Sequence, residues 1–455
     1  MIDKSLARGE IPSSGEAYMV MMRIAMPAII EMMSIAFIGM TSTAMVGRMG
    51  PEAVAAVGLT GQPRMLFMAI LFALNVGVTA IISRRKGEGD RDAARAILRQ
   101  AVELALVIGL TMTTLATILA TPVMKLSGAK SDTIGPATMY FRISSASLFL
   151  SSLTSTICAA QRGVGNTRVT MVVNITANIV NVSFHFLLIE GRFIFPRMGV
   201  AGAGTALALS TVAGSSLAVA SLFRKDAYLK ISPGDNWAFN RDIINQIVKI
   251  GGNSVFEQVC LRIGFFIYSR IIAEIGTQAF AAHQIASQMM NISFTFADGV
   301  AIATTSLVGQ NLGMKRPDLS VMYGKVGQRI ALSVSLVLML LSVVARFWFP
   351  VLFTNDAEVI KLAAGIILIL GFIQPFQMSG IIMAGSLRGS GDVRYVAFTM
   401  LIAVAIMRPV MAYILVFPLG AGLVGAWLAI LVDQGLRSVL LYVRFARGKW
   451  MNIKI

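Results

Sequence analysis

The stretch PAIIEMMSIAFIGMTSTAMVGRMGPEAVAAVGLTGQ, residues 27–62, decides the fold of this chain. Its first part holds about twenty mostly apolar residues, enough for a helix to cross a bilayer, and one acid, Glu31, lies among them. A second stretch, NSVFEQVCLRIGFFIYSRIIAEIGTQAFAAHQIASQ at 253–288, aligns with it when the sequence is shifted by 226 residues (257 − 31). The shift places Glu31 on Glu257, so two copies of one unit share an acid inside an apolar run.

The same shift, with no gap, continues to align the chain with itself far beyond this stretch. It carries Gly50 onto Gly276, Gly87 onto Gly313, and the turn RGVGNTR (162–168) onto RGSGDVR (388–394). A chance match would not hold one register from residue 27 to residue 168. The chain is therefore predicted to be an internal duplication of one helical unit, as in many transporters.

Composition restricts the class of protein. The chain is 56% hydrophobic and 13% charged, with a mean hydropathy of +0.75, whereas soluble domains carry about 25% charged residues. This predicts an all-α polytopic membrane protein. The net charge of +17 lies mainly in short polar segments between apolar runs and therefore does not indicate nucleic-acid binding. Cys158 and Cys260 lie within apolar runs and read as core residues, so neither a metal site nor another cofactor is expected.

Apolar windows predict twelve spans, with six before and six after one polar linker. They cover 24–47, 63–83, 101–121, 143–161, 169–189, 200–223, 250–272, 281–308, 328–349, 358–386, 395–418 and 425–443. The expected domains are an N-terminal tail (1–23), an N-lobe (24–223), a linker (224–249), a C-lobe (250–443) and a C-terminal tail (444–455). Because each half has an even number of spans, the two repeats are predicted to be parallel.

Basic residues predict the orientation in the membrane. Lys and Arg are concentrated in the N-terminal tail, the loop 84–95, the two R-G-x-G-x-x-R turns, the linker, the loop 309–329 and the C-terminal tail. Loops on the other side, such as 121–135 and 189–199, hold few. The protein is predicted to lie in the cell (inner) membrane, and the positive-inside rule then places both termini and both turns in the cytoplasm. No secretory signal is expected at the polar N-terminus.

Several of these segments resemble the multidrug and toxic compound extrusion (MATE) family. The resemblance rests on PAIIE…VGRMG, AAHQIA (281–286), VGQNLG (308–313) and the paired turns, and it covers nearly the whole chain. It implies two six-helix lobes around a central cleft, and export of bulky, often cationic organic compounds driven by inward flow of H⁺ or Na⁺. The expected partners are a small organic substrate, the ion and the lipid bilayer, with a monomeric chain and no nucleic acid. A lipid-linked-precursor flippase of the same superfamily is the alternative function.

Polar residues inside the spans are candidates for the transport chemistry, because a mid-membrane charge costs several kcal/mol unless it is paired or hydrated. On the fifth span, Asn174, Asn178, Asn181 and His185 follow the spacing i, i+4, i+7, i+11, which places them on one helical face. This stripe lines a cavity in one interpretation. In the other, the Asn side chains form hydrogen bonds between helices.

The sequence departs from the residues that the resemblance implies for a cation site. Ser42, in MTSTAMVG, stands where the family has an acid on the first span, and His185 stands where it has one on the fifth. Gln377 lies near the position of an acid on the tenth span, and Glu257 lies about one turn from the family's acid on the seventh. Loss of carboxylates disfavours Na⁺, which prefers oxygen ligands.

We therefore predict H⁺ coupling, with Na⁺ as the alternative ion. The candidate coupling residues are Glu31, Glu257, Asp298 and His185, and the candidate substrate or cavity residues are Ser42, Asn174, Asn178, Asn181, Gln284, Gln374 and Gln377. Glu31 and Ser42 are eleven residues apart and share one stripe of the first span, about 16 Å apart. Burial favours the neutral form of a carboxyl group, which suits proton exchange at Glu31. A hydrogen-bonded packing role is the alternative.

Other charged residues in the spans have simpler interpretations. Asp433 and Arg437 lie at i, i+4 on the twelfth span and are expected to pair with each other. Asp298 either acts in coupling or forms a bridge to Arg262 or Arg408. The chain has two His and two Cys, far apart, and no G-x-x-x-x-G-K-[ST] motif. An enzyme or an ATP-driven pump is therefore not expected.

Overall fold

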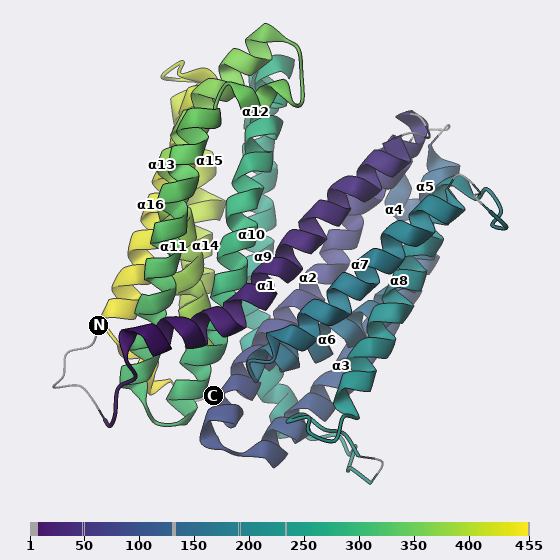
Figure 1. The fold of residues 1–455 in the computed structure, drawn as a ribbon. Helices are drawn as coiled ribbons and strands as arrows, with labels where there is room; N and C mark the ends of the chain where they lie inside the picture. Colours follow the sequence, from purple (N-terminus) through teal and green to yellow (C-terminus); the bar gives the residue numbers. More distant parts are fainter. Residues whose placement is uncertain are drawn as a thin grey trace. The chain divides into compact units, whose positions relative to one another are not determined.

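The computed structural model describes residues 8–453 except 48, 50, 130–132, 190, 192 and 233. Every regular element among these residues is a helix, and most helices of each unit lie side by side with their axes roughly aligned (Figure 1). By length and hydropathy ten of the described helices can span a membrane, or eleven when one bent pair is counted as a span. The predicted all-α polytopic class is confirmed.

The chain forms two compact units, and the second of them consists of Ile30–Gly251. Its helices are α1 (Ser14–Gly47, from Ile30 onward), α2 (Pro51–Glu88), α3 (Arg91–Ile118), α4 (Ala120–Leu126), α5 (Ile134–Ala146), α6 (Leu148–Gly163), α7 (Thr167–Leu188) and α8 (Gly199–Leu222). The predicted fourth span, 143–161, falls on α5 and α6, which are bent by 44° at Ser147. We call this compact unit the N-unit.

The other compact unit consists of Met1–Ile29 and Gly252–Ile455, and we call it the C-unit. Its helices are α9 (Arg241–Ile275, from Gly252 onward), α10 (Thr277–Gly313), α11 (Pro317–Ala345), α12 (Trp348–Val351), α13 (Ala357–Ser390), α14 (Val393–Met400), η2 (Leu401–Met407), α15 (Arg408–Val416), α16 (Gly422–Ala446) and η3 (Lys449–Asn452). Helix α9 lies on the predicted seventh span. It carries Glu257, Arg262 and Arg270, and it is not among the ten described helices that are long and apolar enough to span a membrane.

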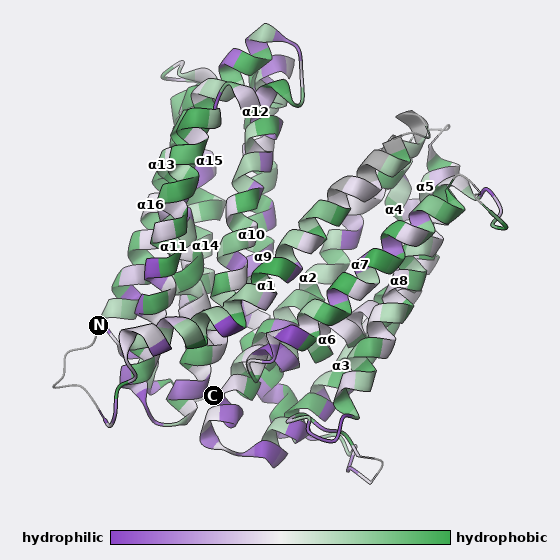
Figure 2. Cartoon of the chain, in the orientation of Figure 1, coloured by the Kyte–Doolittle hydropathy of each residue, from purple (hydrophilic) through white to green (hydrophobic). Residues whose placement is uncertain are grey.

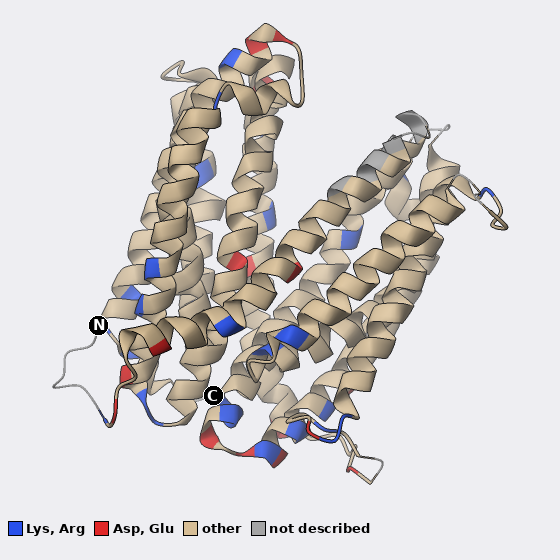
Figure 3. Cartoon of the chain, viewed as in Figure 1, with Lys and Arg blue, Asp and Glu red and all other residues tan. Residues whose placement is uncertain are grey.

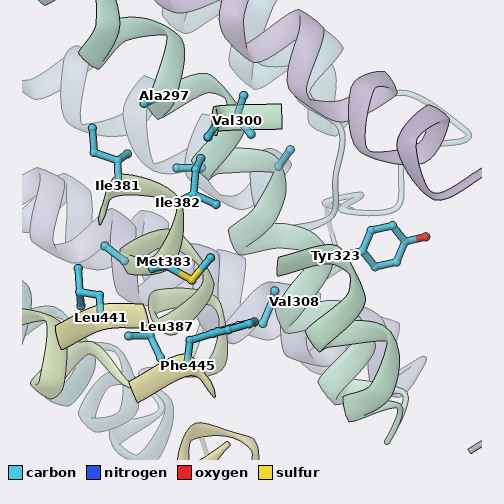
Figure 4. Close-up of a cluster of buried hydrophobic side chains, with 14 of the residues drawn as sticks. Ala297, Val300, Val308, Tyr323, Ile381, Ile382, Met383, Leu387, Leu441 and Phe445 are labelled. Carbon is cyan, nitrogen blue, oxygen red and sulfur yellow. The ribbon is translucent and has the colours of Figure 1, made fainter. Parts of the chain in front are cut away.

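The core of the C-unit lies between α10, α11, α13 and α16. Val300, Ile382, Leu387 and Leu441 are fully buried there, and Figure 4 shows their side chains gathered between these helices. Small residues allow α10 and α13 to approach closely: a Cβ at Gly389 would collide with the backbone of Thr305. Close van der Waals packing of these side chains and small residues fixes the helices of the unit against one another.

The outer faces of the helices are apolar as well. Helix α11, for example, exposes Leu336, Val337, Leu340 and Val344, and hydrophobic residues run along most helices in Figure 2. Charged residues lie mainly near helix ends, with few along the helices (Figure 3). Large exposed apolar surfaces mark contact with a membrane, so this distribution fits helices that are surrounded by lipid.

One segment interrupts the regular helices of the C-unit. Residues Leu401–Met407 form the π-helix η2 between α14 and α15, and Pro409 follows it. A π-helix contains more residues per turn than an α-helix, and proline cannot donate a backbone hydrogen bond. The repeat shift places α14, η2 and α15 on α7, which is an uninterrupted α-helix.

Candidate coupling and substrate site

Glu31 lies in the N-unit with a fully buried side chain. Its Oε1 accepts hydrogen bonds from the guanidinium of Arg162 and from Asn174 Nδ2 at 2.9 Å. Its Oε2 accepts a hydrogen bond from Thr170 Oγ1 at 2.6 Å. A buried charge is tolerated when it is paired and hydrogen-bonded, and this carboxylate has three donors. Helices α1, α6 and α7 are thereby joined at one acid.

The R-G-x-G-x-x-R turn of the N-unit brings these donors together. Arg162 lies in the last turn of α6, and Thr170 and Asn174 lie one helical turn apart near the start of α7. Gly165, between the two helices, has φ +81°, a conformation that glycine adopts without steric cost. The tight turn therefore directs Arg162 toward α1, rather than leaving it only at the membrane surface.

A second polar contact joins α1 to α7. Ser42 Oγ donates a hydrogen bond to Asn181 Oδ1 at 3.2 Å. The stripe on α1 that contains Glu31 and Ser42 thus faces α7, because Asn174 binds the first residue and Asn181 binds the second. Two residues of the predicted α7 stripe therefore bind α1.

The other two stripe residues have different surroundings. Asn178 is half-buried, and its Nδ2 has no hydrogen-bond partner among the described residues. His185 is buried, contacts the carbonyl of Ala203 on α8, and has no described partner at Nδ1. His185 therefore faces α8, and both Asn178 Nδ2 and His185 Nδ1 have free hydrogen-bonding capacity among the described residues.

In the C-unit, Glu257 repeats the position of Glu31 and also pairs with an arginine. Its buried carboxylate accepts a hydrogen bond from Arg388, which is the repeat counterpart of Arg162 (162 + 226). Asp298, which is exposed on α10, also acts electrostatically on Arg388. The structure thus brings Glu257 and Asp298 to one arginine.

The three predicted glutamines lie in the C-unit with different exposure. Gln374 and Gln377 are buried on α13. Gln374 Nε2 donates to Ser342 Oγ at 2.9 Å, and Gln377 Nε2 donates to the Met290 carbonyl at 3.5 Å. Gln284 is exposed on α10, and no hydrogen bond within the described chain joins it to the candidate acids. The glutamines therefore do not form one site with Glu257.

A buried ion pair in the C-unit was not predicted. Arg408 Nε donates to Asp433 Oδ2 at 2.8 Å, both residues are buried, and the guanidinium lies 4.8 Å from the ring centre of Phe265. The expected pairing of Asp433 with Arg437 is wrong, since Arg437 donates to Gln434 instead. Helical spacing shows which residues share a face, but it does not show that a more deeply buried arginine on the neighbouring helix takes the carboxylate.

The described residues contain no group of three or more His, Cys, Asp or Glu that could hold a metal ion. The polar clusters consist instead of single acids bound by guanidinium, amide and hydroxyl donors. Such clusters can exchange a proton or respond electrostatically to a charged ligand.

Comparison with known proteins supports the duplication. The family model described as MatE matches the chain twice, over residues 27–187 and 254–414. The chain is 27% identical over 450 residues to a probable multidrug resistance protein NorM of Thermotoga maritima, covering 98% of this chain and 95% of the relative. It is 26% identical over 437 residues to the multidrug resistance protein PmpM of Pseudomonas aeruginosa, covering 94% and 91%.

Solved structures share the fold over the full length of the chain. An outward-facing multidrug resistance MATE family transporter of the MOP superfamily matches with a TM-score of 0.89, 23% identity and coverage of 99% of both chains. A MOP superfamily transporter from Pyrococcus furiosus, for which a binding pocket of reverse polarity is reported, matches with a TM-score of 0.88 and 23% identity over 98% of this chain and 100% of that one. These solved transporters are therefore similar to this chain in fold.

Proposed function

Because the chain belongs to the MatE family of multi-pass membrane transporters, we propose that it exports bulky, often cationic organic compounds across the cell membrane in exchange for H⁺. Relatives named as multidrug resistance proteins match nearly all of the chain, and members of this family are transporters and not enzymes. The observation that carries the proposed coupling is the buried carboxylate of Glu31, held between α1, α6 and α7.

The donors around Glu31 favour H⁺ over Na⁺. A sodium ion needs several oxygen ligands, whereas Arg162 and Asn174 present N–H groups to the Glu31 carboxylate. A Na⁺ ion would have to displace these N–H donors before the carboxylate and the Thr170 hydroxyl oxygen could serve as ligands. A proton needs only one lone pair of the carboxylate, so proton uptake requires less displacement of these three donors than Na⁺ binding does.

Proton binding at Glu31 would alter substrate binding through charge. The neutral carboxyl group attracts a cationic compound less than the carboxylate does, and this effect acts at a distance in a medium of low dielectric constant. Ser42, Asn178 and Asn181 would supply hydrogen bonds to the substrate in the N-unit. Release of the proton on the opposite side of the membrane would restore the affinity for the next substrate molecule.

The remaining candidate residues have secondary roles in this proposal. His185 and Asp298 are the candidates for a second titrating group, and Glu257 is expected to contribute less than Glu31. Gln284, Gln374 and Gln377 are the candidates for substrate contacts from the C-unit. Glu257 and Asp298 share Arg388, so a change in the charge of one acid would alter the field at the other.

The flippase alternative receives less support from the arginines that would have to bind a pyrophosphate. Arg408 is fully buried and paired with Asp433, whereas Arg270 is exposed and makes only a surface contact with Glu274. A guanidinium that is fully buried in an ion pair cannot bind a phosphate without breaking that pair. The proposal of an exporter of organic compounds is therefore preferred.

Transport by the purified protein in liposomes tests the coupling ion. A fluorescent organic cation is the substrate, and a pH gradient and a Na⁺ gradient are imposed in separate experiments. We expect the pH gradient alone to drive accumulation and the Na⁺ gradient alone to have no effect. Accumulation driven by Na⁺ at equal pH on both sides would overturn the proposed coupling.

Cysteine labelling tests the proposed orientation, with both termini in the cytoplasm. Asn166 is exposed in the turn between α6 and α7, and Ile194 is 94% exposed in the loop before α8. The native Cys158 and Cys260 are buried, so background labelling should be low. An impermeant reagent added to intact cells should label Ile194→Cys and spare Asn166→Cys; the reverse pattern would contradict the orientation.

A further inference from the structure

The C-unit carries a cavity at the ends of three helices that the proposed transport mechanism does not use. Its volume is about 570 Å³, and it lies where α9, the start of α14 and the end of α16 meet. Its lining residues are Asn253, Phe256, Asp392, Arg394, Tyr395, Ala397, Phe398, Leu401 and Arg444. All of them belong to the same compact unit, so the cavity lies within one group of packed helices.

One end of the cavity is basic. Arg444 Nε donates to Asp392 Oδ2 at 2.7 Å, and its guanidinium lies 4.9 Å from the ring centre of Tyr395. The two Nη groups of Arg444 form no hydrogen bond with the described residues, and its side chain is 23% exposed. Arg394 is exposed and forms no ion pair with the described part of the chain. Two guanidiniums and one carboxylate leave a net charge of +1 at this end.

The other end of the cavity is apolar and exposed. Arg394, Phe398 and Leu401 follow one another along α14 and the first residue of η2, and Phe398 is 54% exposed. Seven residues of helix correspond to about 10 Å along the axis. On α9 the order is the same, since the polar Asn253 precedes Phe256, which is 48% exposed. Both walls of the cavity therefore change from polar to apolar in one direction.

The basic end lies at the boundary of a membrane span. The span that contains α14 begins at Val393, and the span on α16 ends at Ala446. Arg394 and Arg444 thus lie at the ends of two helices that are long and apolar enough to span a membrane, where lipid headgroups are expected, and the apolar wall leads from them toward the middle of those helices. A ligand that fits this gradient has an anionic phosphate at one end and a hydrocarbon chain at the other.

We propose that this cavity is a binding site for an anionic phospholipid. Arg394 and the free Nη groups of Arg444 bind the lipid phosphate through charge-assisted hydrogen bonds, and an acyl chain lies against Phe256 and Phe398. Asp392 holds Arg444 in place and is not itself a lipid ligand. The proposal does not depend on the substrate or on the coupling ion of transport.

The repeat supplies a matched comparison within the same chain. Arg394 has the counterpart Arg168 in the N-unit (394 − 226), which is also exposed. The neighbouring lining positions differ in the N-unit: Tyr395 becomes Val169 and Phe398 becomes Val172, and α8, the last helix of the N-unit, contains no arginine. An exposed arginine at this depth is therefore present in both units, while the second arginine and the aromatic wall occur only in the C-unit.

Lipid binding to the purified, delipidated full-length protein tests the proposal. Phosphatidylglycerol and phosphatidylcholine with the same acyl chains are titrated separately, and bound lipid is counted by native mass spectrometry. We expect tighter binding of phosphatidylglycerol, and a loss of about fivefold in its affinity in Arg394→Gln, since one basic residue near the surface contributes about this factor. Arg168→Gln should retain the affinity of the unsubstituted chain.

Two outcomes would overturn the proposal. Equal losses in Arg394→Gln and Arg168→Gln would show that anionic lipids gather around any exposed arginine. Competition by inorganic phosphate at millimolar concentration, without a requirement for acyl chains, would show a site for soluble anions. Arg444→Gln is the second variant, and it should weaken phosphatidylglycerol binding without changing the affinity for phosphatidylcholine.

Discussion

The two units carry the same ion pair, but its surroundings differ. In each unit a buried glutamate on the first helix of the repeat binds the first arginine of an R-G-x-G-x-x-R turn, and the two arginine side chains are 23% and 24% exposed. In the N-unit, Thr170 and Asn174 also donate to the glutamate. The repeat counterparts of these two residues in the C-unit are Val396 and Met400 (170 + 226 and 174 + 226), which donate nothing through their side chains.

The glutamate–arginine pair is thus common to both copies of the duplicated unit, whereas the additional donors to the glutamate are present in one copy. A glutamate–arginine pair that is present in both units fastens the turn to the first helix of the unit. The additional hydroxyl and amide donors bind one glutamate only. We therefore expect proton exchange to depend on the N-unit and structural anchoring to depend on both.

The largest expected effect is the loss of transport in Glu31→Gln. The amide cannot exchange a proton, so efflux driven by a pH gradient should be abolished, while the protein still folds because glutamine keeps an oxygen acceptor for Arg162. Glu257→Gln is the matched control and should retain part of the activity. The measurement is pH-gradient-driven uptake into liposomes, at equal amounts of folded protein. Normal transport by Glu31→Gln, or equal losses in both variants, would remove the proposed difference between the units.

The next effect concerns the contribution of the buried Arg408–Asp433 pair of the C-unit to the stability of the protein. Arg408→Met leaves the carboxylate of Asp433 buried without its counter-ion, and removal of one partner of a buried pair costs about 3–5 kcal/mol. The double variant Arg408→Met with Asp433→Leu should be much less destabilised, since neither charge remains. Denaturant unfolding of the purified protein measures both. A double variant as unstable as the single one would show that the cost arises from packing and not from charge.

A smaller effect is expected when a polar residue of the N-unit is replaced by its C-unit counterpart. Asn174→Met removes a hydrogen bond to the charged Glu31, which contributes about 1.5–3 kcal/mol. Because this bond joins α7 to the Glu31 carboxylate, its loss should lower the rate of pH-gradient-driven transport. The reciprocal Met400→Asn serves as the control and should leave this rate nearly unchanged. Uptake into liposomes under an imposed pH gradient, at equal amounts of folded protein, distinguishes the two.

The smallest effect is expected at Ser42. Ser42→Ala removes one neutral hydrogen-bonding group that the proposal places in contact with the substrate, a loss of about 1 kcal/mol, so the KM for an organic cation should rise by several-fold with kcat nearly unchanged. The dependence on a pH gradient should remain, because Glu31 is intact. Loss of the pH-gradient dependence in Ser42→Ala would move the coupling site from Glu31 to the Ser42–Asn181 contact.

Much of the fold could be predicted from the sequence because apolar length and internal repetition are local properties. The helical stripe of Asn174 and Asn181 followed from spacing alone, and the structure places both against α1. The partner of Glu31 was missed, since the arginines of the two turns were used only to predict the orientation in the membrane. A usable signal existed: the acid and the arginine both recur at the same shift, as Glu257 and Arg388.

Contacts between helices could not be read from periodicity. The pairing of Arg408 with Asp433 depends on which faces of α15 and α16 meet, and hydropathy does not encode that choice. The bend at Ser147 was also not predicted, because the apolar window 143–161 continues across it. Packing against neighbouring helices decides both features, and it involves residues far apart in the sequence.

The π-helical segment changes the phase between the two halves. Before it, buried residues of α7 and α14 correspond at a shift of 226, as Thr167 does to Val393. After it, the buried Asn181 and His185 correspond to the buried Arg408 and Ala412 at a shift of 227. One residue on a helix is a rotation of about 100°. A chimaera that exchanged these helices at a constant shift of 226 would therefore turn every side chain beyond Met400 to the wrong face. Where its junction lies beyond the π-helical segment, the residues of the two units must instead be matched at a shift of 227.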